Sequence, residues 1–113
     1  MESYHGAMEE TNITPLRNSS AHLEKVSECL RTIAHPVRLR MVQLLMRGRY
    51  SVGELAVCCS VQNHMASEHL RLMQRAGLLK SRRDGRKIYY SILEPSLVGL
   101  MERVEAMFDG EVS

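Results

Sequence analysis

The sequence predicts a mainly α-helical protein of one domain, with a single small β-hairpin near its C-terminal end. Its 113 residues provide one hydrophobic core but no large enclosed active site. Apolar residues recur at helical spacing over most of 19–76 and again after Pro95. Between these regions Asp84-Gly85 separates two strand-like runs, which is among the strongest local signals for a hairpin.

The chain is expected to begin with a flexible tail. Residues 1–18 show no periodicity, and the domain is therefore placed at 19–110. Ser19 or Ser20 can cap a first helix. This helix is expected to stop just before Pro36, because the residue preceding a proline disfavours the helical backbone.

The second helix is predicted to start at Pro36, whose fixed backbone angle suits a first helical turn. His35 is expected to help cap it, and Gly48 ends it. Its apolar residues lie on nearly every face, so we expect this helix in the centre of the fold.

A short third helix and a longer fourth helix follow, separated by a break near Ser60. The short helix starts at Ser51 and is expected to turn four residues inward: Val52, Leu55, Ala56 and Cys59. The fourth helix spans about 62–76, with Ala66, Leu70 and Met73 as its buried stripe. Its opposite stripe consists of residues that can form hydrogen bonds: Asn63, Ser67, Arg71 and Gln74.

The hairpin and a last helix complete the predicted fold. The second strand is expected to turn Ile88, Tyr90 and Ile92 inward, because alternate strand residues share a face. The helix that opens at Pro95 carries an apolar stripe wider than a single domain of this size needs.

Charge is segregated along the chain, although the net charge is only +2. Basic residues dominate 29–90, and acidic residues dominate both ends. A basic middle is expected of a protein that binds a polyanion. A solvated charged surface would give the same pattern, so charge alone leaves both interpretations open.

A short helix, a tight break and a helix with a polar outer stripe together predict a helix-turn-helix. Its second helix fits the major groove of DNA, where side chains meet base edges. The candidates for base contacts are Gln62, Asn63, His64, Ser67 and Glu68. A polar stripe is also what any exposed helix carries.

The hairpin favours the DNA-binding interpretation, because cations crowd around its tip without any gain in stability. Phosphates along a DNA backbone would relieve their repulsion. The candidates for phosphate contacts are Arg71, Arg82, Arg83, Arg86 and Lys87. The order of elements, four helices followed by a basic hairpin and a helix, predicts a winged helix-turn-helix.

Several runs resemble the ArsR/SmtB family of winged-helix repressors, in register over roughly 22–108: 30–40, 51–56, 67–73, 76–79 and 82–90. The resemblance implies a homodimer built on the first and last helices, which binds a palindromic operator in double-stranded DNA and is released by an effector. The wide apolar stripe of the last helix agrees with such a dimer. The expected interface residues are Leu23, Val26, Leu30, Leu97, Leu100, Met101, Val104 and Phe108.

The metal sites of that family do not carry over. Its metal ligands lie at positions that this sequence fills with Ser51, Gly53, Glu94, Ser96, Met107 and Gly110. These side chains cannot form a closed zinc site, which needs about four nitrogen, oxygen or sulfur ligands. We therefore expect no metal at either site and no cofactor.

Three cysteines remain, and they do not form a disulfide framework, which fits a reducing compartment. The adjacent Cys58 and Cys59 could bind a thiophilic effector such as arsenite. We favour the interpretation that they are small core residues.

Two positions depart from the family pattern. Ser60 stands where a glycine is usual, and Gln62 stands where a serine usually caps the recognition helix. Because glutamine is a weaker cap, that helix is expected to begin later or to fray.

Two other functions are compatible with parts of this sequence. The first is a winged-helix module that binds an acidic protein. The second is a thiol-dependent redox enzyme using Cys58 or Cys59 with His64, which no Cys-x-x-Cys motif supports. We expect a cytoplasmic protein without enzymatic activity or a membrane partner, since no apolar run approaches the ~18 residues of a membrane span.

Overall fold

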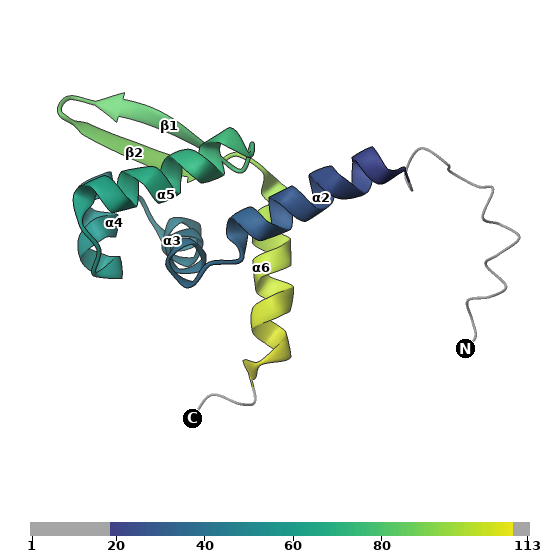
Figure 1. The fold of residues 1–113 in the computed structure, drawn as a ribbon. Helices are drawn as coiled ribbons and strands as arrows, with labels where there is room; N and C mark the ends of the chain where they lie inside the picture. The colour runs from purple at the N-terminus through teal and green to yellow at the C-terminus, as the bar shows by residue number, and fades with distance from the viewer. Residues whose placement is uncertain (1–18, 110–113) are drawn as a thin grey trace, which may run out of the picture. The chain divides into compact units, whose positions relative to one another are not determined.

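The computed structural model describes residues 19–109, so the predicted tail at 1–18 lies outside the described residues. Over this part of the chain the order of elements is the predicted one, mainly helical with one hairpin (Figure 1). The elements are α2 (Ser20–Ile33), α3 (Pro36–Arg47), α4 (Val52–Cys59), α5 (Asn63–Arg75), β1 (Leu79–Asp84), β2 (Lys87–Ile92) and α6 (Pro95–Met107).

The chain divides into two units between Arg31 and Thr32. Most of α2 belongs to the first unit. Ser19 caps this helix as expected, because its Oγ accepts a hydrogen bond of 3.1 Å from the backbone N–H of His22. The other elements belong to the second unit.

Helix α3 forms the centre of the second unit. The backbone N–H of Val37 donates to Nδ1 of His35 at 3.1 Å, so His35 is the predicted cap. Met41 and Val42 have no exposed surface, and of the apolar side chains of α3 only Pro36, at its start, is exposed. This burial on several faces is what its sequence predicts.

The turn between α4 and α5 contains a strained serine. Ser60 has a φ of +57°, the left-handed conformation that favours glycine. Gln62 precedes α5 without any side-chain capping bond, and α5 begins at Asn63. The expectation of a weak cap is confirmed, but the backbone N–H of Ala66 already donates to the Gln62 carbonyl, so the expected late start is not found.

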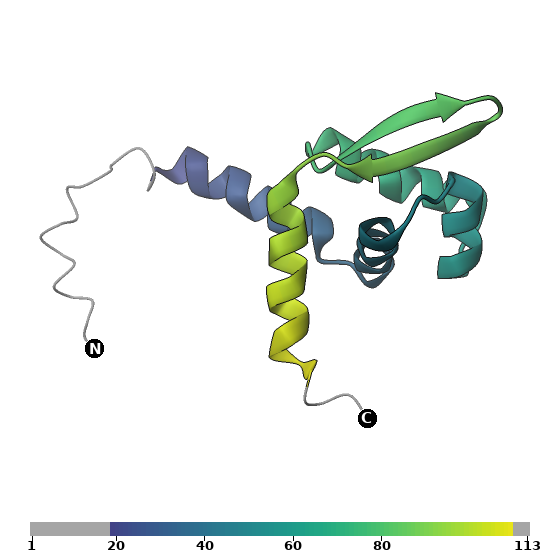
Figure 2. The same cartoon turned by 180° about the vertical axis from the view of Figure 1, so that it is seen from behind.

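The two strands of the hairpin are antiparallel, and Asp84 pairs with Lys87. Gly85 and Arg86 therefore form a two-residue turn, in which Gly85 supplies the left-handed φ of +66°. The hairpin runs alongside α5 and is seen from behind in Figure 2. Of the residues predicted to point inward, Tyr90 is buried and Ile92 half-buried, but the prediction for Ile88 is wrong. Ile88 is exposed because it lies one pair from the tip, beyond the cover of the core.

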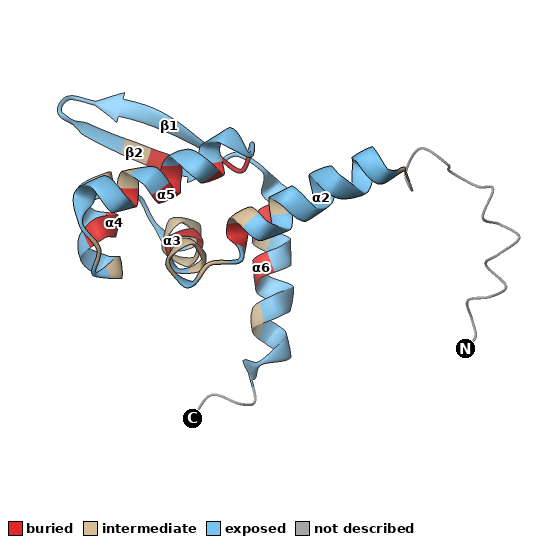
Figure 3. Cartoon of the chain, in the orientation of Figure 1, coloured by how far each residue is buried: buried red, intermediate tan, exposed pale blue. Residues whose placement is uncertain are grey.

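The buried residues of the second unit come from α3, α4, α5, the base of the hairpin and α6, together with Ile33 and Ser51, as Figure 3 shows in red. The largest side chains that are almost completely enclosed are Met41, Val42, Leu55, Leu70, Met73 and Leu79. Among the described helices none has the length and apolar character that a membrane span requires.

Candidate nucleic-acid interface

Helix α5 has the two faces that its sequence predicts. Ala66, Leu70 and Met73 have no exposed surface and attach the helix to the core. On the opposite side Asn63 is exposed and Ser67 is half-buried. The other predicted contacts of this helix or its cap are also exposed: Gln62, His64, Glu68 and Arg71.

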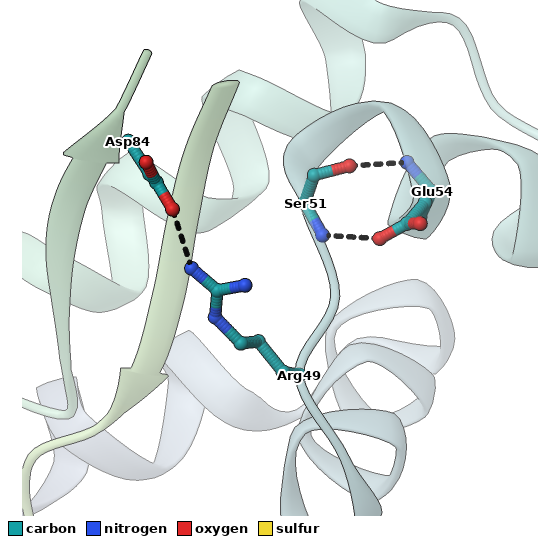
Figure 4. Close-up of polar contacts among 4 residues, drawn as sticks. All are labelled: Arg49, Ser51, Glu54 and Asp84. Carbon is teal, nitrogen blue, oxygen red and sulfur yellow. Dashed lines mark hydrogen bonds and ion pairs between the residues drawn. The ribbon is translucent and has the colours of Figure 1, made fainter. Parts of the chain in front are cut away.

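The start of α4 is fixed by a capping box (Figure 4). The Ser51 hydroxyl accepts from the backbone N–H of Glu54 at 3.2 Å, and the Glu54 carboxylate accepts from the backbone N–H of Ser51 at 2.8 Å. The hydrogen bond from the Ser51 backbone is the main reason that the pKa of Glu54 is lowered. The box sets the position from which α4 leads into α5.

A hollow of about 380 Å³ joins the polar face of α5 to the hairpin. Asn63 and Ser67 line it from α5, and Arg86 and Lys87 line it from the hairpin tip. The structure thus brings together side chains that can read base edges and cations that can bind phosphates. The remaining lining residues are Ser51, Val52, Gly53 and Ile88.

The hairpin cations do not all lie on one face. Residues that pair across an antiparallel ladder point to the same side, so Arg83 shares a face with Ile88, and Arg82 shares the other with Tyr89. Arg82 lines a different hollow of about 240 Å³, together with Arg49 and Tyr89. Lys87 pairs with Asp84 and so shares the face of Arg82, but Arg82 lines a different hollow from Arg86 and Lys87.

Arg49 is a residue of this region that the sequence pattern does not reveal. Its Nη2 donates to Oδ2 of Asp84 at 3.0 Å, and its guanidinium carbon lies 3.7 Å from the centre of the Tyr89 ring (Figure 4 shows the ion pair). A backbone bridge between Ser51 and Tyr89 adds a second link. The available signal was Asp84, a single carboxylate among cations at the tip.

His69 faces the interior of its domain and is buried. Its Nδ1 accepts a hydrogen bond of 3.1 Å from Nε of Arg38, and its ring lies 4.7 Å from that of His35. Burial is the largest cause that lowers the pKa of His69, followed by the nearby His35 and Arg38. His69 thus supports the recognition helix from inside.

The two adjacent cysteines differ in their surroundings. Cys58 is exposed, so the interpretation of both as core residues is wrong for it, and Cys59 is half-buried. The last turn of α4 extends past the core, and Val57 beside them is exposed too. Burial raises the pKa of the Cys59 thiol. Within 19–109 no cluster of three or more histidine, cysteine or acidic residues could hold a metal ion.

The short helix, the turn, the polar-faced helix and the basic hairpin define a winged helix-turn-helix, a class of DNA-binding domain. A family model described as a helix-turn-helix domain matches residues 33–82. The biofilm growth-associated repressor of Agrobacterium fabrum is 32% identical over 94 residues, covering 83% of this chain and 80% of the relative. A transcriptional repressor SmtB homologue of Synechocystis is 32% identical over 81 residues, covering 72% of this chain and 61% of the relative.

Solved structures show the same fold. The homodimeric winged helix-turn-helix domain of a possible ArsR-family regulator from Mycobacterium bovis superposes with a TM-score of 0.74 at 26% identity, covering 85% of this chain and 89% of that one. The transcriptional repressor BigR from Xylella fastidiosa gives a TM-score of 0.70 at 27% identity, covering 94% and 97%. The chain belongs to the ArsR/SmtB family of winged helix-turn-helix transcriptional regulators.

Proposed function

We propose that this protein is a homodimeric repressor that binds a palindromic operator, with one α5 helix of each subunit in the major groove and the hairpins on flanking phosphates. The observation that carries the proposal is the shared hollow in which Asn63 and Ser67 meet Arg86 and Lys87. One bound duplex could contact both sets at once, because base edges and phosphates line the same groove.

We assign the site residues to two groups by the part of DNA that they are expected to contact. The base-reading group is Gln62, Asn63, His64, Ser67 and Glu68, because amide, hydroxyl, imidazole and carboxylate groups can match base edges. The phosphate-binding group is Arg71, Arg82, Arg83, Arg86 and Lys87, because cations position a protein on DNA without reading its sequence.

Dimerisation is supported by exposed apolar side chains on two helices. In α2 these are Leu23, Val26 and Leu30, and in α6 and its C-cap they are Leu100, Val104, Met107 and Phe108. Leu97 and Met101 are predicted for the same interface but are only 3% and 5% exposed in the single chain. They would therefore pack under the exposed residues and would not contact the second copy directly. A second copy would cover the exposed residues and place two α5 helices on the two halves of a palindrome.

Release from DNA by an effector is part of the proposal, and Cys58 and Cys59 are the candidate sensing residues. Vicinal thiolates bind thiophilic ions such as arsenite. Adjacent helical residues point about 100° apart, so chelation needs local unwinding. Cys59 is the last residue of α4, where such unwinding is confined to the helix end. Replacing both cysteines with serine should abolish release by arsenite or oxidant, and unchanged release would remove them from the proposal.

The proposal includes no catalytic step, in keeping with relatives that are transcriptional regulators, and it places the protein with the chromosome in the cytoplasm.

Binding to a labelled duplex from the region upstream of its own gene tests the function. Fluorescence anisotropy should show specific binding in excess competitor DNA. Asn63→Ala should alter sequence preference, whereas Arg86→Ala should weaken binding to every duplex and lower the salt slope by about one unit. Lys80→Ala is a matched control, because Lys80 is an exposed cation of β1 away from the tip. Indifference of the wild-type protein to every duplex at low ionic strength would overturn the proposal.

A further inference from the structure

We propose that Arg49 is a positioning residue for DNA binding: it holds the hairpin in its DNA-binding orientation through Asp84 and Tyr89, without touching DNA itself. This inference rests on the proposed function, because it assumes that the hairpin cations meet phosphates.

The register of the hairpin explains how one side chain reaches both partners. Tyr89 is paired with Arg82, and Asp84 lies two residues further along the same strand as Arg82. Asp84 and Tyr89 therefore share one face of the hairpin and form a diagonal pair. The guanidinium of Arg49 covers this diagonal, with Nη2 at 3.0 Å from Oδ2 of Asp84 and Cζ at 3.7 Å from the Tyr89 ring centre.

The chemistry of this contact requires arginine. A planar guanidinium can stack on an aromatic ring while its edge donates to a carboxylate, and a lysine ammonium cannot do both in this geometry. The contact thus fixes the orientation of the guanidinium relative to the ring and the carboxylate, as well as its distance from them.

Arg49 comes from a rigid part of the chain. It lies between the end of α3, where Gly48 N–H donates to the Leu44 carbonyl, and the buried Ser51, which caps α4. The backbone of Ser51 also pairs with Tyr89. The hairpin is therefore connected to the segment that leads into the helix-turn-helix by a backbone link and a side-chain link.

The tip of the hairpin depends on the side-chain link. Ile88 near the tip is 37% exposed, so apolar packing does little to hold this end. Asp84 is the last residue of β1 and adjoins the turn, and its bond to Arg49 acts at the tip itself. An ion pair this exposed, 64% for each side chain, contributes little to global stability. In this proposal the ion pair instead sets the positions of Arg86 and Lys87.

Because Asp84 is negatively charged, neutralising it should change DNA affinity in opposite directions according to whether Asp84 repels phosphates or positions Arg49. A carboxylate at a DNA-binding tip repels phosphates, so simple electrostatics predicts tighter binding when it is neutralised. Positioning predicts the opposite, because the neutral side chain holds Arg49 less well. Asp84→Asn is therefore the decisive variant, and Arg49→Ala and Arg49→Lys accompany it.

We expect all three variants to bind the operator duplex about tenfold more weakly, the scale of one lost contact. The salt slope should be unchanged, because the hairpin cations still meet the phosphates in the complex and only the cost of ordering the hairpin is added. The double variant of Arg49→Ala and Asp84→Asn should be no weaker than either single variant, because both remove one link. Arg47→Ala, which removes an exposed arginine two residues earlier, is the matched control and should have a smaller effect.

Three outcomes would overturn the inference. Tighter binding by Asp84→Asn would make Asp84 a mere repulsive charge. A salt slope about one unit lower in Arg49→Ala would make Arg49 a direct phosphate contact. Wild-type affinity in Asp84→Asn and Arg49→Lys would leave the link without a role in binding. Failure of the wild-type protein to bind any duplex would instead count against the proposed function.

A measurement without DNA guards against misfolded variants. Amide hydrogen exchange at 86–89 should speed up in Arg49→Ala and Asp84→Asn, while exchange in α5 stays at the wild-type rate. Equal rates at the hairpin in wild type and both variants would contradict the proposed link.

Discussion

Nε of Arg38 donates a hydrogen bond to Nδ1 of His69 at 3.1 Å, and Nη1 of the same arginine donates to the Thr32 carbonyl oxygen at 2.8 Å. The first bond requires an unprotonated Nδ1, so it is made by the neutral imidazole. Arg38 therefore joins the start of α3 to the buried side of α5. The bond to α5 is lost when Nδ1 of His69 takes up a proton.

Stability should fall in acid because of His69. Its pKa is lowered in the folded chain from the usual 6.5, chiefly by burial. Above this pH both folded and unfolded forms are neutral, and below it the unfolded chain takes up a proton first, which favours unfolding. The free energy of unfolding, measured with urea at pH 7.5, 6.5 and 5.5, should decrease through this window.

His69→Gln should show a weaker pH dependence over the same window, whatever its absolute stability. The exposed His22 provides the control, and His22→Gln should retain the wild-type dependence. Equal slopes for wild type and His69→Gln would remove His69 as the cause.

Ser60→Gly should stabilise the protein. A non-glycine residue in the left-handed conformation is strained, and φ is +57° here. After the larger entropy of glycine in the unfolded chain is allowed for, we expect a gain of about 0.5–1 kcal/mol in the free energy of unfolding. Ser60→Ala keeps the strain and should give no gain, and a gain of equal size would argue against strain as the cause.

Loss of the capping box should destabilise α4. Ser51→Ala removes the acceptor for the Glu54 backbone N–H and should cost about 1 kcal/mol in chemical unfolding. Ser27→Ala, at an exposed position inside α2, is the matched control and should be nearly neutral. A cost no larger than that of the control would show that the cap contributes nothing.

A charge on the exposed face of α6 should separate the proposed dimer. Val104 is 42% exposed, so Val104→Asp should leave each chain folded while placing a desolvated carboxylate in the interface. Sedimentation should show monomers at concentrations where wild type is dimeric, with weaker operator binding. Arg103→Ala, exposed on the same helix, should leave the dimer intact. A wild-type sedimentation profile for Val104→Asp would exclude this face.

Alkylation should distinguish the two adjacent cysteines. Cys58 is exposed, whereas burial and the neighbouring Cys58 raise the pKa of Cys59 and reduce its thiolate fraction. Iodoacetamide labelling followed by fragment mass spectrometry should therefore modify Cys58 first. Cys58→Ser should lose the fast phase, and Cys59→Ser should keep it; the reverse order would contradict the structure.

The sequence predicted those features that depend on near neighbours. Pro36 and His35 predict the start of α3, and Asp84-Gly85 predicts the hairpin. Gln62 predicts that α5 starts without a side-chain cap. Each of these signals acts within a few residues, so the pattern of residue types contains it.

The features that escaped prediction depend on distant or marginal packing. Arg49 and Asp84 are 35 residues apart, and no periodicity connects them. Ile88 alternates correctly with Tyr90 but lies past the edge of the core. Helix α4 has eight residues, too few for its apolar pattern to show that Cys58 faces solvent.

Helix α3 contacts two distant parts of the same unit by polar bonds. Near its middle, Nε2 of Gln43 donates to Oε2 of Glu105 in α6 at 2.6 Å, and just beyond its end Arg49 bonds to Asp84. A tilt of α3 would thus strain the bond from Gln43 to the last helix and the bond from Arg49 to the hairpin tip at the same time. The last helix and the hairpin tip of this unit are thus each bonded to α3 or to the residues that directly follow it.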